Sequence, residues 1–351
     1  MMFDYETIGN IHIHSSLSDG TATIDEIAEK AVAAGLDFIY LNDHDYMAKS
    51  LNIEEEGFFG KMPIFMGLEI GKRYNHYLAY NLKEMFNSEG LSPQEIINAV
   101  KRQGGIGFLA HPFEKGMPLH EKSKAYIWND LSVTGFTGVC IWNFASRWKE
   151  RVKSIFHALF LIRFRSQTLK GPSEETMSFY DDLCRNRRVV AIGGSDAHGT
   201  VFKWWRFNIL PLPYESLFKA INIHVLLKQK IFKDFIKAKQ DVCEAMREGR
   251  LFIANDDIYP ARGFRFNYIS DDGSDLHMGE EGEFYPGNLI IESPAKGEIR
   301  LIKDGVVSRR VRGTEAVFPV TEKGVYRVEV YHRLAFFGWR PWIFTNPIYL
   351  R

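Results

Sequence analysis

Nine side chains of types that bind metal ions stand beside short apolar runs in the first two thirds of the chain. Eight of them end or follow a run with a strand-like pattern and one opens such a run: His12, His14, Asp19, His44, Glu69, His76, His111, Asp196 and His198. Imidazole and carboxylate without thiolate suit zinc, manganese or iron and argue against iron–sulfur chemistry. Nine ligands are too many for one tetrahedral ion, so we expect two to three divalent metal ions, with Glu69 able to bridge two of them.

The spacing of these residues supports a cluster rather than isolated ligands. His12 and His14 are two residues apart, so alternation along a strand directs both side chains to one face. Three carboxylates in such a setting need partners, because aspartate and glutamate are seldom buried unpaired. A lone histidine is more often a packed residue than a ligand, and five histidines outside this pattern are interpreted as structural: His120, His157, His224, His277 and His332.

The elements that must position these residues alternate between strands and helices. Helices are predicted to begin after Thr23, which has capping-box spacing to Glu26, after Ser92 with Pro93 at the first position, and near Ser173. Seven strands are predicted at 8–13, 38–41, 64–66, 106–110, 139–142, 189–192 and 207–210. This alternation predicts an α/β fold, a parallel sheet closed into a distorted (β/α)7 TIM-like barrel, whose strand ends converge on one face.

The pattern changes after about residue 256. Helical periodicity disappears, and turn-separated β runs follow at 263–268, 289–292, 299–303, 306–311, 316–319 and 326–331. Asp304–Gly305 lies between two alternating segments, which is a strong hairpin signal. We therefore predict two domains: residues 1–256 as a metallohydrolase barrel and residues 257–351 as an accessory β-sandwich of immunoglobulin-like architecture.

Composition excludes several classes of protein. The 351 residues include 44 basic and 44 acidic side chains, so no stable nucleic-acid partner is expected. Three widely spaced cysteines favour a reducing compartment over a disulfide framework. The N-terminal MMFDYETIGN has no apolar signal-peptide core, and no apolar run approaches the roughly 18 residues of a membrane span. We expect a cytoplasmic protein; its oligomeric state is not predicted.

The ordered motifs HIHSSLSDG, NDHD, GLEI, AHP and SDAH resemble those of the PHP (polymerase and histidinol phosphatase) domain, over roughly residues 8–255. The resemblance implies a distorted (β/α)7 barrel with a trinuclear metal centre that hydrolyses phosphate esters. It also implies three ligand sets, which are His12, His14, Glu69 and Asp196; Glu69, His76 and His111; and Asp19, His44 and His198. The tail at 341–349 is similar to the ending of the carbaryl-hydrolase-like (CehA/McbA) subgroup. NDHD replaces the commoner TDH, and a basic-aromatic insertion separates Arg147 from Ser173.

The function predicted from these features is a metal-dependent phosphoesterase acting on a small phosphorylated molecule. Bound ions lower the pKa of water from about 15.7 towards about 7, which provides a hydroxide nucleophile without a catalytic serine or cysteine. Glu69 and Asp196 are predicted to be catalytic through the metals. Asp43 is predicted to orient a ligand histidine, with a helix N-cap as its alternative role. Predicted substrate contacts are Arg147, Arg206 and Asn143, and three tryptophans are candidates for stacking: Trp148, Trp204 and Trp205.

Two alternatives to a phosphoesterase stay open. A hydrolase of carbamates or carboxylic esters is supported by the tail, and a non-catalytic scaffold is disfavoured by the complete ligand set. The basic-aromatic insertion between Arg147 and Ser173 suggests an amphipathic helix, a lid or a contact for anionic lipid. Ordinary helix packing is the favoured interpretation, so lipid binding is not expected there or at the similar run 228–239.

Overall fold

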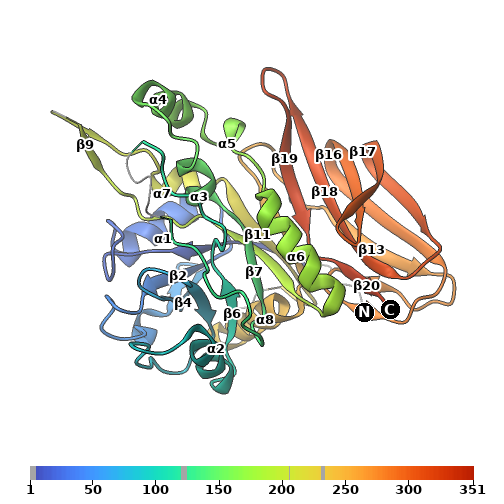
Figure 1. Cartoon of the computed structure of the whole chain (residues 1–351), viewed down its shortest axis with the longest axis horizontal. Helices are drawn as coiled ribbons and strands as arrows, with labels where there is room; N and C mark the ends of the chain where they lie inside the picture. Colours follow the sequence, from blue (N-terminus) through green and yellow to red (C-terminus); the bar gives the residue numbers. More distant parts are fainter. Residues whose placement is uncertain (1–4, 120–124, 205, 231–233) are drawn as a thin grey trace.

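The computed structural model describes residues 5–119, 125–204, 206–230 and 234–351. Its N-terminal two thirds are built on one curved sheet, and the orange and red strands of the C-terminal part lie beside it (Figure 1). The strand order across the N-terminal sheet is β12 (Leu251–Asn255), β11 (Ile221–Leu227), β1 (Tyr5–Ile13), β2 (Phe38–His44), β4 (Met62–Ile70), β5 (Tyr77–Tyr80), β6 (Ile106–Leu109), β7 (Gly138–Asn143) and β8 (Val190–Gly194). The short strand β3 (Gly57–Phe59) follows the 3₁₀ turn η1 (Ile53–Glu55) and pairs with β4.

Strand direction in this sheet is mixed. β1, β2 and β4 run parallel, as do β6, β7 and β8. β5 is antiparallel to both β4 and β6. The connection from β4 to β5 has only six residues, which is too short for the crossover that a parallel pair requires. β11 and β12 are also antiparallel to their neighbours. The fold is therefore α/β with a mixed sheet and not the purely parallel sheet that was predicted.

The predicted closed barrel is not confirmed. Among the described residues no ladder joins β8 to β1; a single bridge connects Ile13 with Ala197 beyond the end of β8. Backbone hydrogen bonds from Ser195 N to Ile11 O (3.2 Å) and from His14 N to Ala197 O (2.9 Å) hold the two strand ends together. The segment after β8 thus reaches the predicted metal ligands His12 and His14 without closing the sheet.

The strand predicted at 207–210 does not belong to the main sheet. β10 (Phe207–Ile209) pairs with β9 (Phe202–Trp204) in a separate hairpin. Beyond β1 the N-terminal sheet continues instead with β11 and β12, which flank α8 (Phe235–Glu248) in the sequence. None of these three elements was predicted.

The helices begin where local capping signals place them. α1 (Ile24–Ala33) starts after a complete capping box between Thr23 and Glu26, and α2 (Pro93–Arg102) after one between Ser92 and Glu95. Ser173 caps α6 (Glu174–Asn186). The insertion forms α3 (Phe144–Lys149), α4 (Ile155–Arg163) and α5 (Arg165–Thr168), and α7 (Tyr214–Leu217) precedes β11. Among the described helices, none has the length and apolar character needed to cross a bilayer.

The C-terminal part consists of antiparallel strands apart from one parallel pair, β15 with β20. Its strands are β13 (Arg265–Ser270), β14 (Leu276–His277), β15 (Glu281–Gly282), β16 (Gly287–Lys303), β17 (Val306–Val320), β18 (Gly324–Leu334), β19 (Gly338–Thr345) and β20 (Ile348–Leu350). The predicted hairpin at Asp304–Gly305 is present between β16 and β17, and both turn residues have positive φ. β16 pairs with β13 along its first half and with β18 along its second half. The immunoglobulin-like sandwich stays a prediction.

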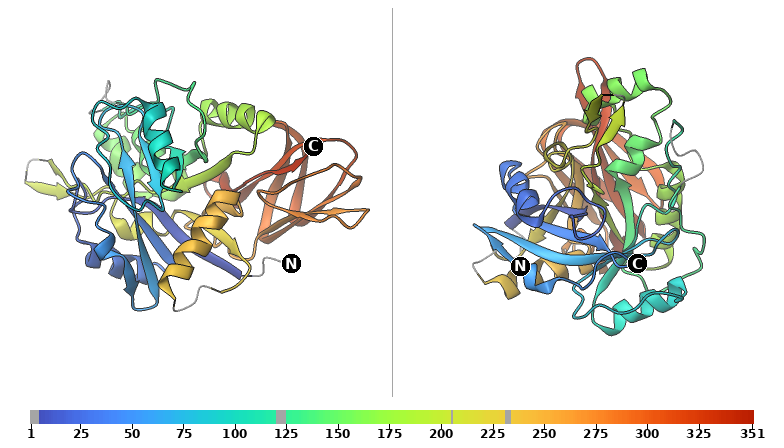
Figure 2. Two further views of the ribbon diagram at one scale, coloured as in Figure 1. Left: turned by 90° about the horizontal axis from the view of Figure 1, so that it is seen from below. Right: turned by 90° about the vertical axis from the view of Figure 1, so that its left-hand side faces the viewer.

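The two parts of the chain share hydrogen bonds and apolar core. β19 pairs with β12, and Phe252 of β12 is buried in the C-terminal core, where its ring contacts Phe264. Asn346, from the tail, donates to Ala191 O (2.9 Å) and Leu251 O (3.0 Å) and accepts from Ala191 N (2.7 Å). Figure 2 shows the contact from two further sides. The tail thus holds β8 and β12 together through the hydrogen bonds of Asn346. The predicted domain boundary at residue 256 stays a prediction.

Candidate metal centre

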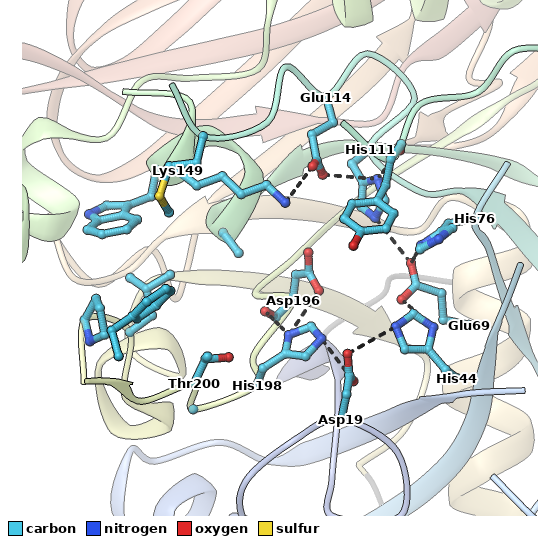
Figure 3. A pocket seen from close by; sticks show the side chains of 18 of the residues that line it. Asp19, His44, Glu69, His76, His111, Glu114, Lys149, Asp196, His198 and Thr200 are labelled. Atoms are coloured by element: carbon cyan, nitrogen blue, oxygen red, sulfur yellow. Dashed lines mark hydrogen bonds and ion pairs between the residues drawn. The ribbon is translucent and has the colours of Figure 1, made fainter. Parts of the chain in front are cut away.

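The nine predicted ligand residues come together at one end of the N-terminal sheet. Figure 3 shows seven of them, all except His12 and His14. β1 provides His12 and is followed directly by His14; β2 ends at His44, and Glu69 lies at the end of β4. The remaining five lie in the connections beside the strands, namely Asp19 after β1, His76 before β5, His111 after β6, and Asp196 and His198 after β8. The prediction that strand ends converge therefore accounts for the grouping of these side chains.

Glu69 lies at the centre of the group, with its carboxylate inaccessible to solvent. Its Oε1 lies 2.8 Å from His76 Nδ1 and 3.2 Å from His111 Nε2. Its Oε2 lies 3.2 Å from Nε2 of both His12 and His14, and 3.6 Å from His44 Nδ1. The two oxygens thus face two different sets of imidazoles, which is the arrangement that a bridging carboxylate requires.

Two aspartates complete the group on the other side. Asp196 Oδ1 lies 3.4 Å from His12 Nε2 and 3.5 Å from both His14 Nε2 and His198 Nδ1. Asp19 lies 3.3 Å from His198 Nε2 through Oδ1 and 3.6 Å from His44 Nε2 through Oδ2. Asp19 is the most exposed of the three carboxylates, and it borders the pocket at its open side.

The backbone is strained at three of the nine residues. The φ angle is 67° at His12, 29° at His111 and 54° at Asp196. Residues with a Cβ avoid this region, and they persist in it mainly where the surrounding structure imposes it, as at functional sites. The register between β1 and β2 also shifts between Asn10 and Ile13. His12 and His14 both lie with Nε2 near one oxygen of Glu69, but an irregular strand rather than the predicted regular alternation brings them there.

The donor set fits divalent metal ions. Six imidazole nitrogens are buried and, among the described residues, have no hydrogen-bond partner: Nδ1 and Nε2 of His12, Nδ1 and Nε2 of His14, Nδ1 of His44 and Nε2 of His76. The nearby carboxylate oxygens lie at ion-pair distance but without hydrogen-bond geometry. Buried polar atoms normally have partners, so converging unpaired nitrogens point to a group that would bind them together.

Three overlapping ligand groups have all their donor atoms within 4.8 Å of one another: His12, His14, Glu69 and Asp196; His14, Asp19, His44 and His198; and His44, Glu69 and His76. The first matches the first set implied by the resemblance. The second contains the third implied set and adds His14. His111 lies outside these groups, but it reaches the same Glu69 oxygen as His76.

The carboxylates make the site strongly attractive to cations. Burial lowers the pKa of His14, but Asp196 and Glu69 oppose this effect and raise it to about 10. Burial raises the pKa of Glu69, yet His12, His76 and His44 hold it well below its usual value. Asp196 is likewise held well below its usual pKa, against the effect of burial, by His12, His14 and His198. Both buried carboxylates are therefore ionised at neutral pH.

Asp43 does not contact a ligand histidine, so its predicted role is corrected. Its Oδ1 accepts from Ser15 N (2.8 Å) and Ser18 Oγ (2.5 Å), and its Oδ2 accepts from Ser15 Oγ (2.7 Å). Nor is it a helix N-cap, because it lies within β2. Asp43 instead fixes the loop that carries Asp19, and it acts on the site by holding that loop in place.

The three predicted substrate contacts do not line the pocket. Arg147 donates from Nε to Gly171 O (2.8 Å) and pairs with Glu150. Arg206 is exposed, outside the pocket lining. Asn143 donates from Nδ2 to Asp196 Oδ2 (3.1 Å) and caps α3 through Oδ1. Asn143 thus orients a predicted metal ligand and leaves Asp196 Oδ1 directed at the histidines.

A partly buried ion pair in the pocket was not predicted. Lys149 Nζ lies 2.5 Å from Glu114 Oε1, and Ser146 Oγ donates to Glu114 Oε2 (2.7 Å). Burial lowers the pKa of Lys149, but Glu114 and Asp196 raise it above its ordinary value, so its amine is charged. The cavity beside it has a volume of about 350 Å³ and is also lined by Tyr126 and Trp148. The sequence around Lys149 contains several other basic residues, so the sequence alone does not indicate that this lysine lies in the pocket. Only the fold shows that Lys149, unlike the neighbouring cations, contacts Glu114 there.

The other histidines and tryptophans are placed as follows. His224 is buried between Glu6 Oε1 (2.6 Å) and Asp256 Oδ2 (3.0 Å), away from the metal-binding group. His157 lies on α4, and His277 and His332 lie in the C-terminal strands. His120 and Trp205 lie outside the described residues. Trp148 lines the pocket and donates to Leu161 O (3.3 Å), which anchors α3 to α4.

Comparison with known proteins gives one family match and several structural likenesses, two of which are described next. Residues 10–126, about a third of the chain, match the model of the PHP domain. No curated protein matches the chain. A two-domain protein from Bacteroides vulgatus, containing a predicted PHP-like metal-dependent phosphoesterase, is 14% identical with a TM-score of 0.48, over 97% of this chain and 95% of that one. A candidate metal-dependent phosphoesterase from Bifidobacterium adolescentis is 18% identical with a TM-score of 0.34, over 54% of this chain and 87% of that one.

Because the sequence identities and TM-scores are this low, we infer no function from either of the two structures. The family match spans seven of the nine predicted ligands, from His12 to His111. Asp196 and His198 lie beyond it, and the fold nevertheless brings both into the same group. The resemblance to the carbaryl-hydrolase-like subgroup is not confirmed. Residues 10–126 are therefore similar to a PHP domain, and two ligands from outside that segment complete the site.

Proposed function

We propose that this protein is a metal-dependent phosphoesterase that hydrolyses a small phosphorylated molecule. The observation that carries the proposal is the convergence of six imidazoles and three carboxylates in which six buried nitrogens have no hydrogen-bond partner among the described residues. The match of residues 10–126 to the PHP domain supports it independently of the geometry.

The chain's own residues would hold two or three divalent ions, of zinc, manganese or iron, in the groups described above. Such ions, when bound, supply positive charge to a phosphate ester and lower the pKa of a water molecule towards about 7. Glu69 serves two neighbouring groups through its two oxygens. Asn143 orients Asp196, and Asp43 holds the loop of Asp19, so both act by positioning metal ligands.

Lys149 is the substrate-binding cation of this proposal. It lines the same pocket as His111, Asp196 and His198, and its ammonium is directed toward Glu114 in Figure 3. A partly buried ammonium can hold a phosphate oxygen by a charge-assisted hydrogen bond. Glu114 keeps the amine charged and fixes its position before substrate arrives. This role replaces the one predicted for Arg147 and Arg206.

The proposal is tested by measuring hydrolysis of p-nitrophenyl phosphate, bis(p-nitrophenyl) phosphate and an aryl carbamate. The full chain is used after chelation and after reloading with Zn²⁺, Mn²⁺ or Fe²⁺. We expect metal-dependent turnover of a phosphoester, and a loss of about 10- to 100-fold in kcat/KM for Lys149→Met, mainly through KM. Lys115→Met is the matched control, because Lys115 is exposed and pairs with Glu175 outside the metal group.

Two results would contradict this proposal. Turnover of the carbamate without turnover of either phosphoester would favour the alternative hydrolase. Absence of metal-dependent turnover on all three substrates, in protein that has bound its metals, would favour a non-catalytic scaffold.

A further inference from the structure

The helix α4 exposes a continuous apolar face. Ile155, Phe156, Leu159 and Phe160 are exposed, with Phe156 at 86%, whereas Leu161 on the opposite side is buried in the core. In a soluble protein a helix that is apolar all round is normally buried. Ordinary helix packing was predicted for this segment, but only one side of α4 is packed.

Two other segments extend this face. Phe336, in the turn between β18 and β19, is 96% exposed, and its neighbour Phe337 packs against Phe164 with ring centroids 5.2 Å apart. Phe164 in turn contacts Phe160 of α4. Arg165 donates to Pro211 O (2.6 Å), which joins the insertion to the chain that follows the β9–β10 hairpin. Figure 1 shows α4 and the β18–β19 turn at the top of the molecule and the hairpin extending to the upper left beside α4. The right panel of Figure 2 shows this end of the molecule from the side.

The charge of these three segments is entirely positive. Residues 151–170 contain five arginines and lysines, residues 199–210 contain two and residues 333–340 contain two, and none of the segments contains aspartate or glutamate. The whole chain, by contrast, has 44 residues of each sign. Six of the nine cations are exposed: Lys153, Arg163, Lys170, Lys203, Arg206 and Arg333. Burial and repulsion by Arg340 lower the pKa of Arg151, so cations from different segments lie near one another.

We propose that α4, the β9–β10 hairpin and the β18–β19 turn form a surface that docks onto an anionic lipid bilayer. Exposed aliphatic and aromatic side chains surrounded by cations match the boundary between acyl chains and acidic headgroups. The inference does not rest on the proposed function. It does place the bilayer beside the pocket, because Phe202, Pro211 and Leu212 of this region also line the candidate metal site.

Other partners fit this surface less well. Nucleic acid is bound through cations and flat rings on which bases stack, whereas Ile155 and Leu159 offer aliphatic side chains. In a symmetric dimer the same patch would face itself, and six exposed cations of each copy would then repel those of the other. An anionic bilayer can accept the exposed apolar side chains among its acyl chains and pair its acidic headgroups with the surrounding cations.

Flotation of the full chain with vesicles tests this proposal. We expect binding to 1:1 phosphatidylglycerol–phosphatidylcholine vesicles at low salt, weaker binding at 0.5 M NaCl and none to phosphatidylcholine alone. The double variant Phe156→Ser/Phe336→Ser should bind at least about tenfold more weakly, because it removes the two most exposed apolar anchors. Lys153→Glu/Arg163→Glu should also weaken binding. Ile269→Ser/Val317→Ser is the matched control, since these exposed side chains lie on β13 and β17 and the variant should bind like wild type.

Several outcomes would overturn the proposal. They are absence of binding to the anionic vesicles, and binding that the double phenylalanine variant leaves unchanged. Equal affinity for single-stranded DNA that persists in the phenylalanine variant would identify a general polyanion surface instead. A wild-type dimer that the same variant converts to a monomer, measured by light scattering, would identify a self-association surface.

Discussion

Replacing Glu69 with glutamine keeps the size of the side chain and removes one negative charge from the centre of the candidate site. Nitrogens of five histidines lie within 3.6 Å of its two oxygens. Two of the three ligand groups include this carboxylate, so we expect Glu69→Gln to weaken metal binding in both. The metal affinity of the third group, which contains Asp19, should change less.

The size of the effect follows from the charge that is lost. Two unit charges 4 Å apart interact by about 4 kcal/mol at an effective dielectric constant of ~20, and a divalent ion carries twice that charge. A loss of at least ~4 kcal/mol corresponds to about a 10³-fold weaker metal affinity. Turnover should fall by a similar factor or more, because each 1.36 kcal/mol changes a rate about tenfold.

Element analysis after gel filtration in metal-free buffer measures this effect, together with turnover of a chromogenic phosphoester. Glu56→Gln is the matched control. Glu56 is also a largely buried glutamate beside β4, but it accepts from Met66 N (2.8 Å) and pairs with Lys239 (2.7 Å), away from the metal group. Its variant should keep its metal. Full metal content and normal turnover in Glu69→Gln would show that Glu69 is not a bridging ligand.

Three other measurements test parts of the structure. Asp43→Asn should reduce the affinity for the metal ion nearest Asp19 by about 10- to 100-fold in a calorimetric titration, because it weakens the bonds that hold that loop; unchanged affinity would contradict this role. Burial lowers the pKa of His224, but Asp256 and Glu6 raise it to about 9, so the stability it provides is complete below pH ~6.5 and is lost as pH rises through ~9. In urea unfolding, the free energy of unfolding of the wild type should therefore fall by on the order of 3 kcal/mol over this pH range, and that of His224→Gln should not. If the free energies of unfolding of the two proteins changed in parallel with pH, the role assigned to His224 would be wrong. Asn346→Ala should lower the free energy of unfolding by about 2–4 kcal/mol without changing metal content, because it leaves buried backbone groups on β8 and β12 unpaired. A loss below about 1 kcal/mol would show that the tail does not stabilise β8 and β12 through this residue.

Local signals in the sequence predicted much of what positions the site. The capping boxes at Thr23 and Ser92 are local hydrogen-bond patterns, and the helices begin where these patterns predict. The candidate metal ligands were identifiable because each lies next to an apolar strand, and strands of one sheet bring such positions together.

Features that depend on contacts far apart in the chain were not predictable in this way. The antiparallel direction of β5 follows from a short connection, and the pairing of β11 with β1 joins residues more than 200 positions apart. Arg147 looked like a substrate contact, but its guanidinium is bound by Gly171 O and Glu150. Lys149 was overlooked because its partner, Glu114, comes from a separate segment.

The central claim is that the nine converging residues hold a cluster of metal ions. Anomalous diffraction from crystals of the full chain, collected on both sides of the absorption edge of the metal found by element analysis, tests it most directly. We expect two or three anomalous peaks, each enclosed by one of the predicted ligand groups, with Glu69 between two of them. Absence of any peak among these residues, in crystals of protein that contains the metal, would contradict the claim.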